Sequence, residues 1–114
     1  FNFGRMERDF TFVNDIISGI TPLIKIKKRK SNMHKIYNLG NNKPQKLLKM
    51  VSLLEMLCKR KAKINKKRIQ LGDVRHTYAS IKESKKDLKF KPKTNLKDGL
   101  EKFVTWYKDY HNIH

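Results

Sequence analysis

The sequence has 114 residues, a length that fits one small domain and excludes a two-domain enzyme. Its 38% of hydrophobic residues can build a core, and its single cysteine excludes a disulfide framework or a multi-cysteine zinc site. The formal net charge of +18 is of the kind that attracts polyanions. No apolar run is long enough to cross a bilayer and the N-terminus has no signal-peptide pattern, so we expect a cytoplasmic chain without a membrane partner.

The positive charge alone does not establish a nucleic-acid partner. Most of the cations are lysines spread along the chain, whereas arginine is the better donor to phosphates and base edges. The densest cluster, residues 25–30, resembles an RNA-contact or nuclear-localisation patch, but such runs more often form a solvated loop. We therefore do not expect nucleic acid as the partner, and we keep a small basic nucleic-acid-binding protein as the alternative function.

The N-terminal quarter predicts a strand followed by a helix. Residues 9–13 combine aromatic and β-branched side chains, which favours a short strand. Asn14 or Asp15 can then cap a helix, along which apolar residues recur at helical spacing. Gly19 and Pro22 are expected to keep this helix short or distorted.

The middle of the chain predicts a loop over 27–34, a second short strand over 34–39 and a turn at 40–42. Pro44 suits the first turn of the next helix, because its missing N–H costs nothing there. One apolar face of that helix comprises Leu47, Met50, Val51, Leu54, Leu57 and Cys58. We expect Cys58 to be a core thiol, since nothing in the sequence supplies a base to make it a nucleophile.

The C-terminal half predicts an edge strand over 59–70 and two helices. Residues 80–83 form a capping box, which begins a helix that runs to about Leu88. Asn95 or Thr94 begins the last helix. Its buried stripe comprises Leu96, Leu100, Phe103, Val104 and Tyr107, with Trp106 and Tyr110 packed beside it.

These elements predict an α+β fold, mostly helical with about three short strands, in a single domain over residues 1–114. The glycines lie too far apart for a dinucleotide fingerprint or a P-loop, and the histidines are too scattered to predict a metal site. The acidic residues form no evident general acid–base pair. We therefore expect no catalytic residue, no metal and no cofactor bound by this chain alone.

Several ordered motifs resemble one enzyme family. Residues 1–20 contain RDFTFVNDI, which resembles the RDFTYVDDI segment of UDP-glucuronate 4-epimerases, NAD-dependent nucleotide-sugar epimerases of the extended short-chain dehydrogenase/reductase superfamily. Residues 36–44, 70–74 and 90–94 are similar to the YNIGNNxP, QPGDV and GFxPxT motifs of that family, in the same order. Residues 99–107 resemble its terminal helix.

The resemblance is to the C-terminal third of such an enzyme, which implies a substrate-binding portion of the fold with the Rossmann domain absent. The GxxGxxG loop and YxxxK pair of the family are not in this sequence, so NAD is implied only for the complete enzyme. We expect the substrate-side remnant of a split, truncated or decayed epimerase gene, inactive alone unless a complementary N-terminal Rossmann chain joins it. Its partner is then a UDP-sugar, in the synthesis of cell-surface polysaccharide precursors, or the remnant has no function.

The resemblance assigns two charged residues to the substrate. Arg8 matches the arginine that the family directs at the UDP diphosphate, a role that suits a permanently charged fork of donors. Asp73 matches the acid near the ribose hydroxyls, where a carboxylate accepts hydrogen bonds. Without the resemblance, a surface ion pair with Asp9 or Asp15 is the favoured explanation of Arg8, and a Gly-Asp turn is the alternative explanation of Asp73.

Two further residues complete the expected substrate site. Phe1 resembles the end of the segment whose backbone meets the uracil ring. Gln70 lies where related galactose epimerases carry a phosphate-contacting arginine, so its neutral amide compensates less charge. Arg75 and His76 replace Pro-Ala and add polar bulk beside this site. The other departures from the family are Phe12, Asn14, Leu71 and Ser80.

Overall fold

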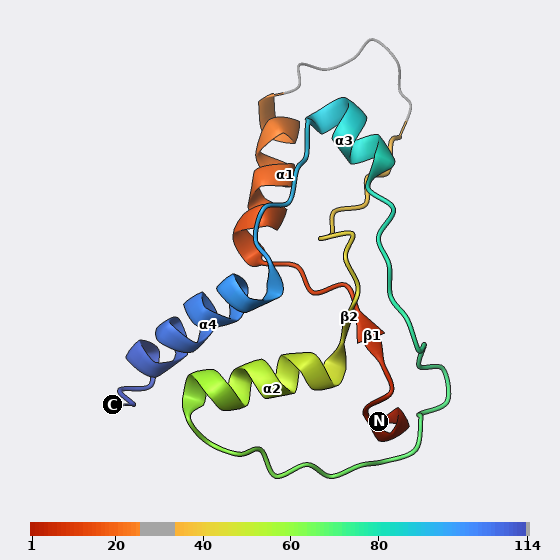
Figure 1. The fold of residues 1–114 in the computed structure, drawn as a ribbon. Helices are drawn as coiled ribbons and strands as arrows, with labels where there is room; N and C mark the ends of the chain where they lie inside the picture. The colour runs from red at the N-terminus through yellow and green to blue at the C-terminus, as the bar shows by residue number, and fades with distance from the viewer. Residues whose placement is uncertain (26–33, 114) are drawn as a thin grey trace.

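The computed structural model describes residues 1–25 and 34–113. The described chain contains, in order, the short 3-10 helix η1 (Asn2–Gly4), β1 (Glu7–Arg8), α1 (Val13–Lys25), β2 (Gln45–Lys46), α2 (Leu47–Cys58), α3 (Lys82–Leu88) and α4 (Leu96–Tyr110) (Figure 1). The predicted α+β class, mostly helical, is confirmed. The loop expected over 27–34 and the basic cluster at 25–30 fall largely on residues outside the described part.

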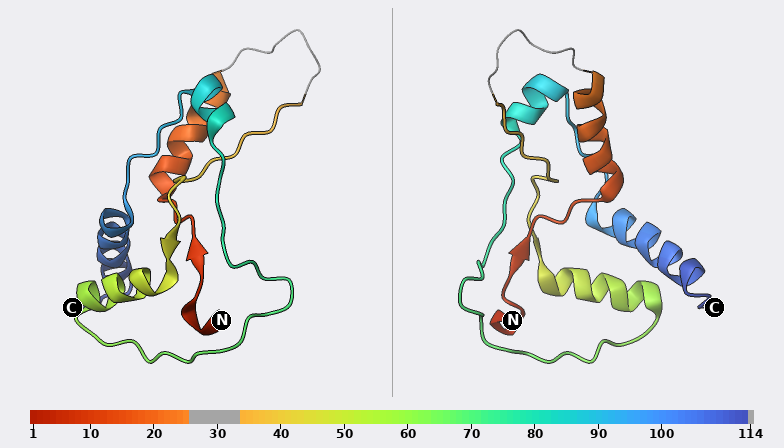
Figure 2. Two further views of the ribbon diagram at one scale, coloured as in Figure 1. Left: turned by 45° about the vertical axis from the view of Figure 1, so that its right-hand side comes forward. Right: turned by 180° about the vertical axis from the view of Figure 1, so that it is seen from behind.

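The elements form an open, elongated arrangement. The Cα radius of gyration is 17.5 Å, against about 13 Å for a compact domain of this length. Figures 1 and 2 show α1 and α3 side by side at one end, with α2 and α4 at the other. The small sheet lies between the two ends, so the chain has two small packed regions joined by extended segments.

The sheet is built on β1. This strand pairs antiparallel with β2, with Glu7 opposite Lys46 and Arg8 opposite Gln45. On its other side Glu7 forms a parallel bridge with His76. In the described residues this gives two short strands and one bridge, where about three strands were expected.

The strand expected over 9–13 was misplaced. Strand β1 ends at Arg8, and α1 begins directly at Val13. Between them, the Asp9 carboxylate and the Thr11 hydroxyl accept hydrogen bonds from backbone N–H groups of residues 41–43, at 2.9–3.2 Å. Because side chains take the place of carbonyls as acceptors there, no backbone ladder forms.

The predicted cap of α1 was also wrong. Asp15 lies inside the first turn of the helix, and its carboxylate accepts from the backbone N–H groups of Lys93 (3.2 Å) and Thr94 (2.9 Å). It is 7% exposed. The carboxylate thus joins α1 to the segment that leads into α4, and the helix runs through Pro22 to Lys25.

The core at the α1–α3 end is small. Buried Ile81, Leu88 and Phe90 pack with partly buried Tyr37, Leu39 and Ala79. Gly19 allows α1 to approach this cluster, because a Cβ there would lie 2.7 Å from Leu39 and 2.9 Å from Phe90. The first turn of α3 follows Ile81, and the capping box expected at residues 80–83 is not formed.

The strand expected over 34–39 does not form in the described structure. This segment is bound to α3 through side chains instead. The Ser84 hydroxyl donates to the Asn38 carbonyl at 2.7 Å, and the Asn38 amide donates to the Ser80 carbonyl at 3.4 Å. A strand requires a neighbouring backbone to complete its ladder, and no described segment provides one here.

Helix α2 was predicted correctly, but its flanks were not. Pro44 precedes β2 and does not lie in the first helical turn. Cys58 is exposed, because α2 ends at this residue and Lys59 adopts the left-handed conformation that turns the chain away. The segment 59–70, expected as an edge strand, contains no strand.

Helix α4 has the predicted start and an unexpected surface. The Asn95 side chain accepts from the backbone N–H of Asp98, so the predicted cap is confirmed. Val104 is buried, as expected. Four aromatic residues expected in the core are instead 43–68% exposed, because nothing in the described chain covers this side of the helix; they are Phe103, Trp106, Tyr107 and Tyr110.

Candidate functional site

Arg8 and Asp73, 65 residues apart in sequence, are joined by an ion pair. The Arg8 Nη2 atom lies 2.8 Å from the Asp73 Oδ1 atom, and their side chains are 25% and 28% exposed. Arg8 lies on β1. Asp73 lies three residues before His76, where the chain forms its bridge to that strand. The pair therefore forms where the sheet brings both segments together.

The backbone fixes the other end of the Arg8 guanidinium. Its Nη1 atom donates to the carbonyls of Glu7 at 2.9 Å and of Arg75 at 3.3 Å. These contacts and the one to Asp73 employ three of the five N–H groups of a guanidinium. An arginine held in this way is preorganised, so little side-chain entropy remains to be lost when it binds a ligand.

Asp73 lies at the end of a tight turn. Its backbone N–H donates to the Gln70 carbonyl at 3.2 Å, and Gly72 has a φ of 83°, a left-handed conformation that suits glycine. The Asp73 Oδ1 atom also accepts from the N–H of Val74 at 2.9 Å. The turn explanation of Asp73 is thus correct, and the same turn directs its carboxylate at Arg8.

The other two expected site residues lie on the neighbouring segments. Gln70 is exposed and begins the turn that contains Asp73. Phe1 is 46% exposed and precedes η1, which the Phe3 N–H ties to the Lys67 carbonyl at 2.9 Å. The structure therefore brings Arg8 and Asp73 into contact, with Gln70 in the Asp73 turn, and it gives no direct contact of Phe1 with this pair.

The alternative partners expected for Arg8 are engaged elsewhere. Asp9 accepts from the backbone N–H groups of Asn42, Lys43 and Ala79, and Asp15 accepts from those of residues 93 and 94. The surface pairs of Arg8 with Asp9 or Asp15 are therefore wrong.

The shifted pKa values in the described chain belong to contacts away from Arg8. The hydrogen bond from Lys35 lowers the pKa of Asp87, and the same contact raises the pKa of Lys35. The backbone N–H of Ala62 lowers the pKa of Glu55. Both carboxylates fasten extended segments to helices, so they support the fold and give no sign of acid–base chemistry.

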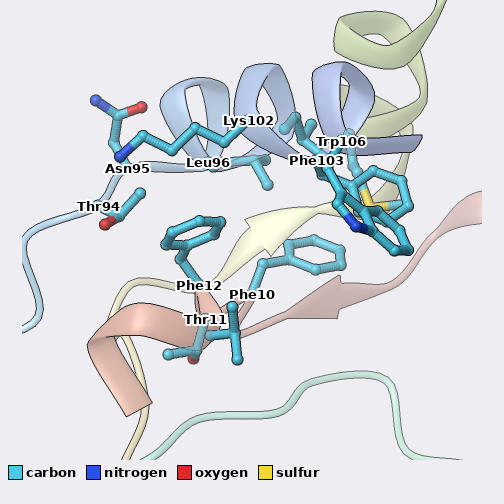
Figure 3. A pocket seen from close by; sticks show the side chains of 13 residues that line it. Phe10, Thr11, Phe12, Thr94, Asn95, Leu96, Lys102, Phe103 and Trp106 are labelled. Atoms are coloured by element: carbon cyan, nitrogen blue, oxygen red, sulfur yellow. The ribbon is translucent and has the colours of Figure 1, made fainter. Parts of the chain in front are cut away.

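Sequence reasoning missed an apolar groove of about 550 Å³ between α4 and the residues that precede α1. Figure 3 shows Phe10 and Phe12 opposite Phe103 and Trp106 in this groove. The sequence predicted Phe103 and Trp106 in the core beside the last helix, and Phe10 and Phe12 in the strand over 9–13. The groove does not include Arg8 or Asp73, so it is a separate feature.

The described residues contain neither a metal-binding cluster nor a membrane-spanning helix. No group of three or more His, Cys, Asp or Glu side chains in residues 1–25 and 34–113 could hold a metal ion. In the same part of the chain, every helix is too short or too polar to span a bilayer.

Comparison with known proteins relates the chain to epimerases. It is 42% identical over 107 residues to a protein of Methanocaldococcus jannaschii, covering 94% of this chain and 32% of that protein. It is 37% identical over 121 residues to UDP-glucuronate 4-epimerase 3 of Arabidopsis thaliana, covering 97% of this chain and 28% of that enzyme. No protein-family model matches the sequence.

Solved structures agree. The UDP-glucuronic acid 4-epimerase of Bacillus cereus, in complex with UDP-glucuronic acid and NAD, superposes with a TM-score of 0.84 at 28% identity, covering 96% of this chain and 34% of that structure. The chain thus spans about a third of the length of the relatives it matches. Its fold corresponds to the C-terminal portion of NAD-dependent nucleotide-sugar epimerases of the extended short-chain dehydrogenase/reductase type.

Proposed function

We propose that this chain is the UDP-sugar-binding portion of an NAD-dependent 4-epimerase that acts on UDP-glucuronate or a related UDP-sugar. The observation that carries the proposal is the preorganised Arg8–Asp73 pair, at the two positions where the sequence resembles the family's nucleotide-binding residues. The similarity to UDP-glucuronate 4-epimerases over nearly the whole chain supports it.

In this proposal each residue contacts a different part of the nucleotide. Arg8 directs charge-assisted hydrogen bonds at the diphosphate, and Asp73 holds Arg8 in place and accepts from the ribose hydroxyls. Gln70, in the Asp73 turn, contributes a neutral amide beside the phosphates. The backbone at Phe1 borders the uracil ring.

The residues of this chain do not fit NAD. A dinucleotide pyrophosphate requires a glycine-rich loop at a helix N-terminus, and at least fourteen residues lie between any two of the five glycines here. We therefore assign the cofactor, and with it the oxidation and reduction of the sugar, to a Rossmann portion supplied by other residues. This chain binds and orients the nucleotide end of the substrate, and by this proposal it is inactive alone.

A two-component assay tests the proposal. The chain is mixed with a separately expressed NAD-binding portion of the Bacillus cereus epimerase, and conversion of UDP-glucuronate to UDP-galacturonate is measured. We expect turnover only in the mixture, and a loss of about tenfold or more in kcat/KM when Arg8→Gln replaces the wild type, because charge-assisted hydrogen bonds contribute about 1.5–3 kcal/mol. The exposed Arg68→Gln variant is the matched control. Absence of turnover in the mixture, or equal activity of both variants, would contradict the proposal.

A further inference from the structure

The proposed diphosphate site lacks charge compensation if Arg8 is its only cation. The Asp73 carboxylate, 2.8 Å from the Arg8 guanidinium, offsets most of the positive charge of Arg8. Gln70 is neutral. The diphosphate of a UDP-sugar carries two negative charges, so a second cation is required for strong binding.

The bridge to β1 brings the backbone of Arg75 beside Arg8. Glu7 is bonded to the backbone on both sides of His76, through the Arg75 carbonyl at 2.9 Å and the Thr77 N–H at 3.2 Å. The side chains of Glu7 and His76 meet at 3.2 Å, so they share one face of the pair. Arg8 follows Glu7 on the first segment, and Arg75 precedes His76 at a bend in the second, so the two arginines flank this pair.

Two contacts support this placement. Asp73, two residues before Arg75, reaches Arg8 directly. The Arg75 carbonyl accepts from the Arg8 Nη1 atom at 3.3 Å, so the two arginines are adjacent through the backbone. The Arg75 side chain is exposed, and within residues 1–25 and 34–113 it enters no ion pair, which leaves its charge uncompensated.

We propose that Arg75 is a second diphosphate-binding residue. It supplies positive charge to a site where Asp73 neutralises Arg8 and Gln70 contributes none. The inference rests on the proposed UDP-sugar function. It also gives a role to a departure from the family pattern, since the resembling motif has proline at this position. A guanidinium is suited to the role, because it binds phosphate oxygens through two parallel N–H groups.

Calorimetric binding of UDP and of uridine to the full chain tests the inference, with folding of each variant checked by circular dichroism. We expect Arg75→Gln to weaken UDP about tenfold and to leave uridine unchanged, because uridine has no phosphate. Arg75→Lys should give a smaller loss, since it keeps the charge but not the fork. The loss should diminish as salt screens the exposed charge. Arg68→Gln, also exposed, is the control.

The outcomes separate this inference from the proposed function. If the wild type binds UDP, Arg8→Gln loses affinity and Arg75→Gln binds like the wild type, the role of Arg75 is wrong and the UDP site stands. Equal losses of UDP and uridine in Arg75→Gln would assign it a structural role and overturn the inference. A wild-type chain that binds no UDP would overturn both.

Discussion

Two aspartates act as backbone acceptors between segments far apart in sequence. Asp9 binds three N–H groups on two other segments, and Asp15 binds two on a third. Buried or partly buried carboxylates that accept several N–H groups stabilise a fold, because removal leaves those donors without partners. Because few side chains of the described residues are buried, we expect these contacts to contribute a large share of the free energy of folding.

Substitution of Asp9 should therefore be costly. Asp9→Ala removes the acceptor for Asn42, Lys43 and Ala79, and we expect the free energy of unfolding to fall by about 3 kcal/mol. Urea unfolding followed by circular dichroism measures the change. The matched control is Asp109→Ala, at an exposed position near the end of α4, which should change stability by less than about 0.5 kcal/mol. Equal effects of the two substitutions would contradict this account.

Asp87 should give a measurable pH dependence. Hydrogen bonds from Lys35 and then from Tyr37 lower its pKa from 3.8, so its contribution to stability is complete above that value and is lost as the pH falls through the lower folded pKa. The difference in melting temperature between the wild type and Asp87→Asn should be largest near pH 7 and should shrink below about pH 4. A difference that stays constant from pH 7 to pH 2 would show that the charge of Asp87 is not involved.

The residue assignments show what sequence could and could not supply. The family resemblance assigned Arg8 and Asp73 to different parts of one nucleotide, and the structure places the two residues in contact with each other. Residue chemistry alone favoured Asp9 or Asp15 as partners of Arg8, since they are near in sequence. That preference failed because the Asp9 and Asp15 carboxylates accept from backbone N–H groups of other segments, and the sequence does not reveal which N–H groups lie near them.

At the scale of elements, helices were predictable and strands were not. Helix α2 follows its own apolar periodicity, and α4 begins at its own cap. The sequence predicted strands over 9–13, 34–39 and 59–70. Each would need hydrogen bonds to an adjacent strand, and the sequence does not identify that strand. Side-chain acceptors replaced the ladder in the first, Ser84 and Ser80 fastened the second, and the third has no strand partner in the described chain.

The cap of α4 offers a test at this scale. Asn95→Ala removes the side-chain acceptor for the N–H of Asp98, at 3.0 Å, and should destabilise the chain by about 1 kcal/mol. Thermal unfolding measures it. Asn14→Ala, an exposed change inside α1, is the control and should be neutral or slightly stabilising, because alanine favours helix interiors. If both substitutions have the same effect, the cap does not stabilise α4.

In the whole molecule, an apolar surface is left uncovered by residues 1–25 and 34–113. The groove beside α4 contains Phe10, Phe12, Phe103 and Trp106, and Trp106 is 53% exposed. Trp106 stacks on Tyr110 with ring centroids 5.4 Å apart, which extends the apolar surface along the helix. Contiguous surfaces of this kind mark contact sites for other protein segments. The sequence predicted Phe103 and Trp106 in a core, because helical periodicity does not distinguish an uncovered apolar face from a buried one.

This surface should bind a hydrophobic dye. We expect the double variant Phe103→Gln, Trp106→Gln to reduce the fluorescence of bound anilinonaphthalene sulfonate severalfold relative to the wild type, because it removes the two large rings from the groove. Tyr78→Gln, at an exposed position outside the groove, is the control and should leave the signal unchanged. Unchanged dye binding in the double variant would show that the groove is not the accessible apolar surface.

The proposed function requires Arg8 and Asp73 to hold the nucleotide end of a UDP-sugar. Titration of the isotope-labelled chain with UDP-glucuronate, followed through the backbone amide resonances, measures this binding residue by residue. We expect the largest saturable shifts at residues 7–8 and 70–77, with little change along α4, and loss of these shifts in Arg8→Gln. Saturable shifts confined to α4 and the groove, or no shifts from a folded chain, would contradict the claim.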